Sequence, residues 1–218
     1  MNNISDFLFE KLKINSKSKI NHYNYFPEDK KELENILKEL ITKRGNDANL
    51  NDIDTSKITD MSSIFEKLDP HNINISEWDV SKVTDMKCMF YKCKNFNSDL
   101  SKWDVSNVKN MYYMFKECEN FNSNLSDWDV SNVEDMMGMF NGCTSFNSDI
   151  GNWDVRKVKD MSSMFSYSSF DGDISKWFPK SLKWSEEIYY KCPLDFHTDK
   201  MFINVKTQEA YNRLVLGK

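Results

Sequence analysis

Cysteine side chains recur at a constant interval in this sequence and could do redox or metal chemistry. Cys93, Cys118 and Cys143 are 25 residues apart. Stacked repeats would place their Cα atoms about 5 Å apart, which is within disulfide range. The interval is not the Cys-x-x-Cys spacing of a zinc site, so small apolar side chains in a reduced core are the favoured interpretation. We expect all five cysteines to be free thiols.

Aspartates recur with the same interval and predict a column of carboxylates. Like charges stacked this closely repel each other unless each accepts backbone hydrogen bonds at a turn, or a cation bridges them. Turn capping is the favoured interpretation, because nothing resembles the glycine-rich nonapeptide of calcium-binding β-rolls. We predict no metal site and no cofactor. The column comprises Asp54, Asp79, Asp104, Asp129 and Asp154.

Tryptophans and methionines follow the same interval. Trp78, Trp103 and their equivalents would form a carbohydrate-stacking platform if their rings were exposed, and the methionines would suit copper or an adaptable partner. The spacing of Met86, Met89 and Phe90 favours core packing instead. We therefore predict that both residue types are buried.

Catalytic motifs are absent from the sequence. His22, His71 and His197 lie outside the regular repeats and share no spacing that implies a site. The chain lacks a G-x-S-x-G motif, a glycine-rich phosphate loop and an H-E-x-x-H motif. We predict that this protein is not an enzyme.

One repeated unit positions all of these residues. It reads approximately W-D-V-S-x-V-x-D-M-x-x-M-F-x-x-C-x-x-F-N-S-x-L-S-x. The M-x-x-M-F-x-x-C part has the spacing of one face of a short helix, and F-N-S-x-L alternates like a half-buried strand. The predicted fold is an α/β repeat solenoid, leucine-rich-repeat-like, with one short parallel strand and one short helix per 25-residue coil.

Four regions are predicted along the chain. An amphipathic helix and linker occupy 1–25, and a capping helix occupies 26–49, with Gly45 just past its end. The solenoid covers 50–192 in six units, of which the first and last are degenerate. A C-terminal cap of one strand and one helix covers 193–218.

Composition limits the partners and the compartment. Lys+Arg 29 against Asp+Glu 34 gives a formal charge of -5, without a basic patch, so we predict no nucleic-acid partner. No apolar run approaches the roughly 20 residues that span a bilayer. The N-terminus lacks the features of a signal peptide, which favours a cytoplasmic or virion-associated location over classical secretion.

The units resemble the BspA-like leucine-rich-repeat proteins, in the branch known as a 25-residue repeat of unknown function in mycoplasma surface lipoproteins. The segment W-D-V-S-N-V-K-N-M-Y-Y-M-F-K-E-C, from Trp103 to Cys118, and its copies carry this resemblance over about residues 50–178. The resemblance implies a leucine-rich-repeat-like fold and a role in adhesion or protein binding, usually on a bacterial surface. The chain departs from that family by lacking a signal peptide, lipobox or wall-sorting tail, so a phage or prophage origin stays open.

We expect a protein-interaction or adhesion module that binds through the outward side chains of successive strands. This polar, acid-leaning strand face suits a basic or hydroxyl-rich partner. Glycan binding is an alternative, as is a structural spacer docked through its N-terminal helix to a larger particle. The predicted binding residues are Asn74, Ser76, Asp99, Ser101, Lys102, Asn124, Ser126, Asp127, Asp149, Asn152, Asp173 and Ser175.

Overall fold

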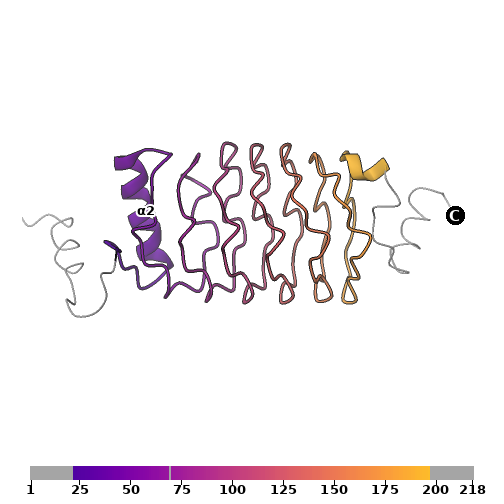
Figure 1. The fold of residues 1–218 in the computed structure, drawn as a ribbon, viewed down its shortest axis with the longest axis horizontal. Coiled ribbons are helices and arrows are strands. Elements are labelled where there is room, and N and C mark those ends of the chain that lie inside the picture. Colours follow the sequence, from indigo (N-terminus) through magenta and orange to yellow (C-terminus); the bar gives the residue numbers. More distant parts are fainter. Residues whose placement is uncertain (1–21, 69, 197–218) are drawn as a thin grey trace, which may run out of the picture.

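The computed structural model describes residues 22–68 and 70–196, which form a row of stacked coils along one long axis (Figure 1). The α-helix α2 (Lys30–Arg44) precedes the coils, and the short 3-10 helix η1 (Pro193–Phe196) comes after them. Six coils follow one another at intervals of 24 or 25 residues. We number them one to six in chain order, each by its residue in the bridges that join neighbouring coils. These residues are Asp60, Asp85, Asn110, Asp135, Asp160 and Trp184.

The predicted leucine-rich-repeat-like α/β solenoid is wrong. The described coils contain neither a helix nor an extended strand, and neighbouring coils are paired through isolated parallel bridges. Each coil is therefore a succession of turns, and the stack lacks the parallel sheet and the layer of helices that were predicted. The prediction fails for two segments of each coil, M-x-x-M-F-x-x-C and F-N-S-x-L, which lie on different sides of the coil.

The M-x-x-M-F-x-x-C segment, predicted as a helix, is a run of consecutive turns. The amide of Met89 donates to the carbonyl of Met86, whereas the amide of Phe90 donates to Met114 in the next coil. Cys88 has a φ angle of 54°, which a right-handed helix cannot contain. Repeated turns bury every third or fourth residue just as a helix does, so the apolar spacing did not distinguish the two.

Backbone hydrogen bonds join the coils along this side. The amides of Met86 and Cys88 donate to the carbonyls of Asn110 and Tyr112 at 2.9 Å, and later coils repeat the pattern. We call this side the ladder face. Its variable positions come after the first methionine and the phenylalanine of each unit: Ser62, Ser63, Glu66 and Lys67; Lys87, Cys88, Tyr91 and Lys92; Tyr112, Tyr113, Lys116 and Glu117; Met137, Gly138, Asn141 and Gly142; Ser162, Ser163, Ser166 and Tyr167; Glu186, Glu187, Tyr190 and Lys191.

The F-N-S-x-L segment, predicted as a strand, is joined to its neighbours through side chains. The amide of Leu100 donates to Oγ of Ser123 at 2.9 Å, and Leu125 donates to Ser148 in the same way. Asn122 donates its amide to the side-chain oxygen of Asn97 at 2.9 Å. Only at the beginning of the stack do such segments pair through the main chain, in the isolated bridge between Asn49 and Asn74. In the later coils a side chain replaces the main-chain partner that a β-ladder requires, so no strand forms among the described residues.

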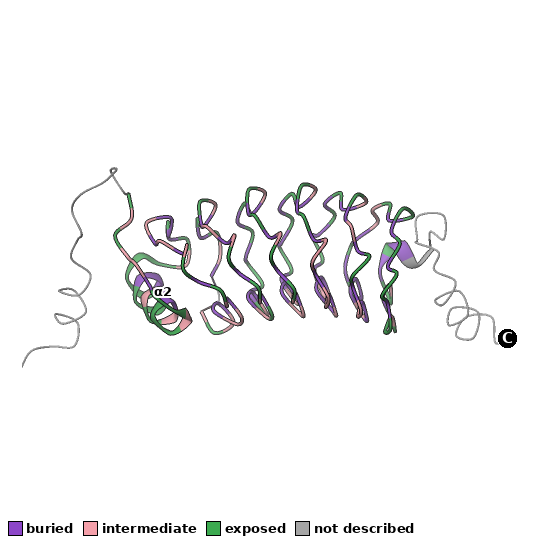
Figure 2. Cartoon of the chain, turned by 90° about the horizontal axis from the view of Figure 1, so that it is seen from below, coloured by how far each residue is buried: buried purple, intermediate pink, exposed green. Residues whose placement is uncertain are grey.

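The interior of the stack consists of columns of identical side chains. Phe90 and Phe115 stack with their ring centroids 5.5 Å apart, and the tryptophans form a parallel column in which Trp128 and Trp153 are 6.4 Å apart. Such aromatic pairs contribute about 0.5–1.5 kcal/mol each beyond the burial of their area. The purple inner sides of the coils in Figure 2 correspond to these residues.

Helix α2 covers the first coil. Asp29 caps its N-terminus by accepting the amide of Glu32, and Leu33, Leu37 and Leu40 are fully buried. At 15 residues, with charged side chains on its outer face, α2 lacks the length and apolarity that a bilayer crossing needs, and η1 is shorter still. The helix predicted within 1–25 and the strand and helix predicted within 193–218 fall largely outside the described residues.

Candidate binding surfaces

The predicted binding residues line one edge of the stack, which we call the polar edge. In each coil an aspartate or asparagine side chain accepts the amide two residues later, as Asp99 does from Ser101 at 2.9 Å and Asn124 from Ser126 at 3.0 Å. Hydrogen bonds from the hydroxyl and amide of Ser101 lower the pKa of Asp99. The polar edge comprises Asn74, Ser76, Asp99, Ser101, Lys102, Asn124, Ser126, Asp127, Asp149, Asn152, Asp173 and Ser175.

This geometry assigns a structural role as turn acceptors to Asp99, Asn124, Asp149 and Asp173. Their neighbours Lys102, Asp127 and Asn152 are exposed. Whether a partner contacts them stays a prediction.

The second aspartate column also caps turns. The side-chain oxygen of Asp79 accepts the amide of Ser81, and that of Asp129 accepts the amide of Ser131, both at 3.0 Å. Within the described residues, no group of three or more histidine, cysteine, aspartate or glutamate side chains is arranged to hold a metal ion. The backbone amides therefore supply the positive partners of these carboxylates.

The repeat tryptophans are buried, with 2–4% of each residue exposed. Their indole nitrogens donate to a carbonyl of the preceding coil, as Trp128 does to Leu100 at 3.0 Å. These rings consequently offer no stacking platform for a carbohydrate.

The cysteines are free thiols, as predicted, and all but Cys88 are buried. The thiol of Cys118 donates to the carbonyl of Phe90 at 2.9 Å, and burial raises its pKa well above the ordinary value. Such a thiol is a poor nucleophile and metal ligand, because the thiolate is the reactive form.

The ladder face differs from the rest of the coil because its variable positions change from unit to unit. The inward residues and the turn-capping residues are nearly the same in coils two to five, whereas all four variable positions of the ladder face differ from coil to coil. The polar edge has one such position in each coil, occupied by Lys102, Asp127 and Asn152 in coils that follow one another. Directly after the first methionine, for example, coil two has Lys87, coil three Tyr112 and coil four Met137. Sequence reasoning missed this face because those residues were assigned to helices. The internal variation was the signal that could have identified it.

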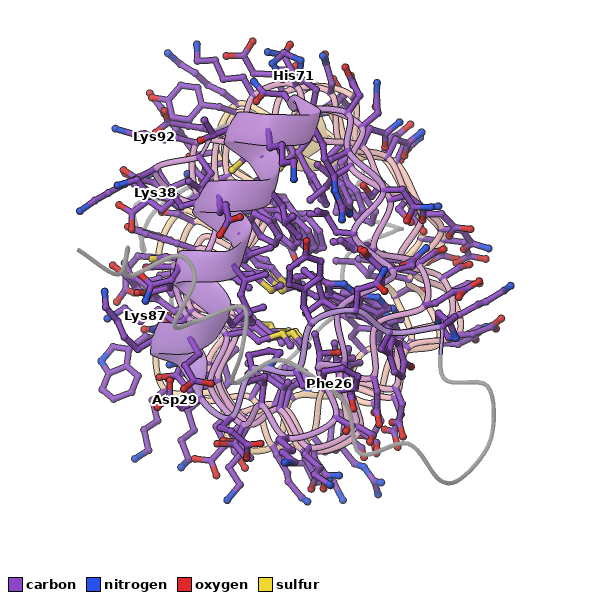
Figure 3. The ribbon with its side chains drawn as sticks, turned by 90° about the vertical axis from the view of Figure 1, so that its left-hand side faces the viewer. Phe26, Asp29, Lys38, His71, Lys87 and Lys92 are labelled. Carbon is purple, nitrogen blue, oxygen red and sulfur yellow. The ribbon has the colours of Figure 1, made fainter. Side chains whose placement is uncertain are left out.

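Aromatic and cationic side chains gather on coils two and three of the ladder face, and a second group on coils five and six places Lys191 over the rings of Tyr167 and Tyr190. We call the group on coils two and three the Tyr–Lys patch; Figure 3 shows its Lys87 and Lys92 extending from the same side of the stack. The rings of Tyr112 and Tyr113 stack with their centroids 4.0 Å apart, and the ring centroid of Tyr91 lies 6.2 Å from that of Tyr113. The patch comprises Lys87, Tyr91, Lys92, Tyr112, Tyr113 and Lys116.

Each lysine of the patch lies over a tyrosine ring. The Nζ atom is 5.2 Å from the ring centroid of Tyr112 for Lys87, and 4.3 Å from that of Tyr113 for Lys116. Burial, and after it the hydrogen bond with Tyr113, raises the pKa of Tyr112 to about 12. At neutral pH the patch therefore presents ammonium groups on neutral rings.

A shallow depression of about 400 Å³ lies farther along the same face. Trp184 is 48% exposed at this depression, and its other lining residues come from coils four to six. Those residues are Met137, Asp160, Ser162, Ser163 and Glu186. An apolar side chain of a partner would contact both Met137 and the indole there.

Comparison with known proteins identifies a family but no characterised relative. The family model described as "Mycoplasma protein of unknown function, DUF285" matches residues 31–136 and 120–215. No curated protein and no solved structure matches the chain significantly. The predicted likeness to a mycoplasma repeat of unknown function is thus confirmed at the level of the family, and the leucine-rich-repeat assignment is not confirmed. Because the matches together span most of the sequence, the chain belongs to the DUF285 family.

Proposed function

We propose that this protein is a non-enzymatic interaction or adhesion module that binds a protein partner through the ladder face. The observation that carries the proposal is that each coil combines near-constant buried and turn-capping positions with four variable positions on the ladder face. A repeated scaffold that varies on one surface is the arrangement by which repeat proteins present binding residues.

The side chains on the ladder face suit protein recognition. Tyrosine and tryptophan are enriched at the energetic centres of interfaces, and this face carries Tyr91, Tyr112, Tyr113, Tyr167 and Tyr190, with Trp184 beside it. The main-chain bonds between coils hold these positions in place before binding, which lowers the entropic cost of association.

The polar edge is the second candidate surface. Its exposed residues Lys102, Asp127 and Asn152 recur at a regular interval, which supports many weak contacts with a basic or hydroxyl-rich partner. We propose this surface as the alternative to the ladder face for protein binding.

A capture experiment with two surface variants tests these alternatives. The ladder variant combines Tyr112→Ala with Trp184→Ala, and the edge variant combines Lys102→Glu with Asp127→Lys and Asn152→Lys. The edge variant leaves the turn acceptors intact, so both variants should keep the circular dichroism spectrum of the wild type. Bait would be the purified chain, with captured proteins quantified by mass spectrometry.

A protein enriched by wild type and the edge variant but lost with the ladder variant would support binding at the ladder face. A protein that only the edge variant fails to capture would identify the polar edge as the binding surface. Equal enrichment by all three proteins would refute both surfaces.

A further inference from the structure

The lysines of the Tyr–Lys patch form no salt bridge with a carboxylate of the described residues. Other lysines of this acidic chain form ion pairs, such as Lys94 with Glu119 at 2.9 Å. Lys87, Lys92 and Lys116 lie on tyrosine rings instead, at 5.2, 5.0 and 4.3 Å from the ring centroids. Three ammonium groups are therefore gathered on two adjacent coils outside salt-bridge distance of the described carboxylates, of which Glu66 and Glu117 act on Lys92 and Asp135 on Lys87 only through space.

An incoming carboxylate can engage these ammonium groups at little cost. A lysine held over an exposed ring gains only about 0.5–1 kcal/mol, and the ammonium retains its hydrogen-bond donors. Lys87 and Lys92 are exposed, so each can form a charge-assisted hydrogen bond to an arriving anion while its stem remains on the ring. The patch is thus preorganised for anionic groups flanked by aromatic surface.

The surroundings of the patch favour a short acidic segment over a long polyanion. Coils four to six carry Asp135, Asp160, Glu186 and Glu187 on or beside the same face, where Lys191 is the only lysine among the described variable positions, within a chain of formal charge -5. A nucleic acid or sulfated polysaccharide continuing along the stack would meet these carboxylates and be repelled. A polypeptide can place acidic residues on coils two and three and uncharged residues beyond them.

The depression next to the patch indicates which kind of residue a bound segment would place beyond its acidic part. Met137, which lines it, belongs to coil four, and Trp184 belongs to coil six. Coil five, the middle of the three coils that line the depression, is two coil steps beyond Lys116 of coil three. Two steps of about 4.8 Å amount to roughly 10 Å, which an extended peptide spans with about three residues. An apolar side chain at that interval would reach Met137 and the exposed indole.

We propose that the Tyr–Lys patch binds an acidic polypeptide segment of a partner protein, with an apolar residue of that segment in the depression at Trp184. The inference rests on the proposed function and names the chemistry of the partner at the same face. The charge complementarity of the patch, rather than the apolar depression, selects the acidic residues.

Fluorescence anisotropy with defined probes tests this proposal on the full chain. The main probe is a fluorescein-labelled oligoglutamate peptide that ends in three glycines and a leucine; a second has glutamine for glutamate, and a third is labelled heparin. The patch variant is Lys87→Glu with Lys116→Glu. Its matched control is Lys82→Glu with Lys176→Glu, two exposed lysines with the same change in net charge.

We expect the oligoglutamate probe to bind wild type and the control variant, and to bind the patch variant about tenfold more weakly, since two surface charge contacts are reversed. Added salt should weaken the wild-type affinity. Replacing the leucine of the peptide by glycine should weaken binding to wild type but not to a Trp184→Ala variant.

Several results would overturn the proposal. Equal binding of the glutamate and glutamine peptides would show that the negative charge of the peptide does not contribute to binding. Tighter binding of heparin than of the peptide would identify a polyanion as the ligand of the patch. Self-association in sedimentation velocity that the patch variant abolishes would make a second copy the occupant. A protein partner captured through the ladder face despite no peptide binding would refute this inference alone and leave the proposed function standing.

Discussion

Removing the hydroxyl of Ser123 tests whether side chains, rather than main-chain pairing, join the coils opposite the ladder face. Oγ of Ser123 accepts the amide of Leu100 at 2.9 Å, and both residues are buried. The variant Ser123→Ala leaves this amide without a partner in a site that water does not reach. A buried donor without an acceptor costs about 1–3 kcal/mol, so we expect the free energy of unfolding to fall by about 2 kcal/mol.

The matched control is Ser101→Ala, which makes the same chemical change at a half-exposed turn position. The hydrogen bond from the hydroxyl of Ser101 to Asp99 is lost, but at a position that water reaches, and the amide of Ser101 still donates to Asp99, so the change should be within about 0.5 kcal/mol. Urea unfolding monitored by circular dichroism measures both variants. Hydrogen exchange at Leu100 provides a local readout, because a repeat stack need not unfold in one step.

In Ser123→Ala the Leu100 amide should exchange at least about tenfold faster, since 1.4 kcal/mol corresponds to a factor of ten. If the two variants have equal stability and Leu100 keeps its protection, the side-chain bridge does not hold the coils together. Main-chain hydrogen bonds would then have to be what holds the coils together on this side of the stack.

Three further predictions concern a close contact, an ion pair and a thiol. Gly138→Ala should destabilise by about 1–2 kcal/mol, because the new Cβ would lie 2.3 Å from the Tyr113 ring and φ is 58°; adding Tyr113→Ala should recover part of this loss in urea unfolding. A hydrogen bond from Arg44 lowers the pKa of Asp52 in the folded protein. The ion pair therefore stabilises the fold fully above about pH 3.8, and this stabilisation is lost as the pH falls through the lowered pKa of folded Asp52. Asp52→Asn should therefore be less stable than wild type at neutral pH and differ little in strong acid. Ellman's reagent should modify Cys88 alone in the folded protein, and slowly, because burial raises its pKa.

The conformation of each segment was predicted less well than its burial. The positions of Met86 and Leu100 inside the stack could be inferred from residue type and interval alone, because burying apolar area is the main favourable term in folding. The helix and the strand predicted around them were wrong, because their amides bond to other coils. Hydrogen bonds of that kind join residues about 25 positions apart and leave no local periodicity.

The candidate site likewise combines features that could be inferred from the sequence with features that could not. The turn-capping role of Asp79 could be inferred from its spacing, since an aspartate side chain reaches an amide two residues on. The grouping of Lys87 with Tyr112 could not, because it requires two coils to stack with one residue directly beside its equivalent. The glycan alternative lost support when Trp128 proved to be buried, with its indole N–H donating to a carbonyl of the preceding coil.

The sequence by itself determined the repeat interval, the side chains that form the buried columns and the aspartates that cap the turns. These features depend on the apolarity of a side chain or on hydrogen bonds within a few residues. Only the tertiary structure decided that the coils are turns joined by single bridges, and that the four variable positions after the methionine and phenylalanine lie together on the ladder face. Both depend on contacts between coils, where the register of stacking determines which amide meets which carbonyl and which lysine meets which ring.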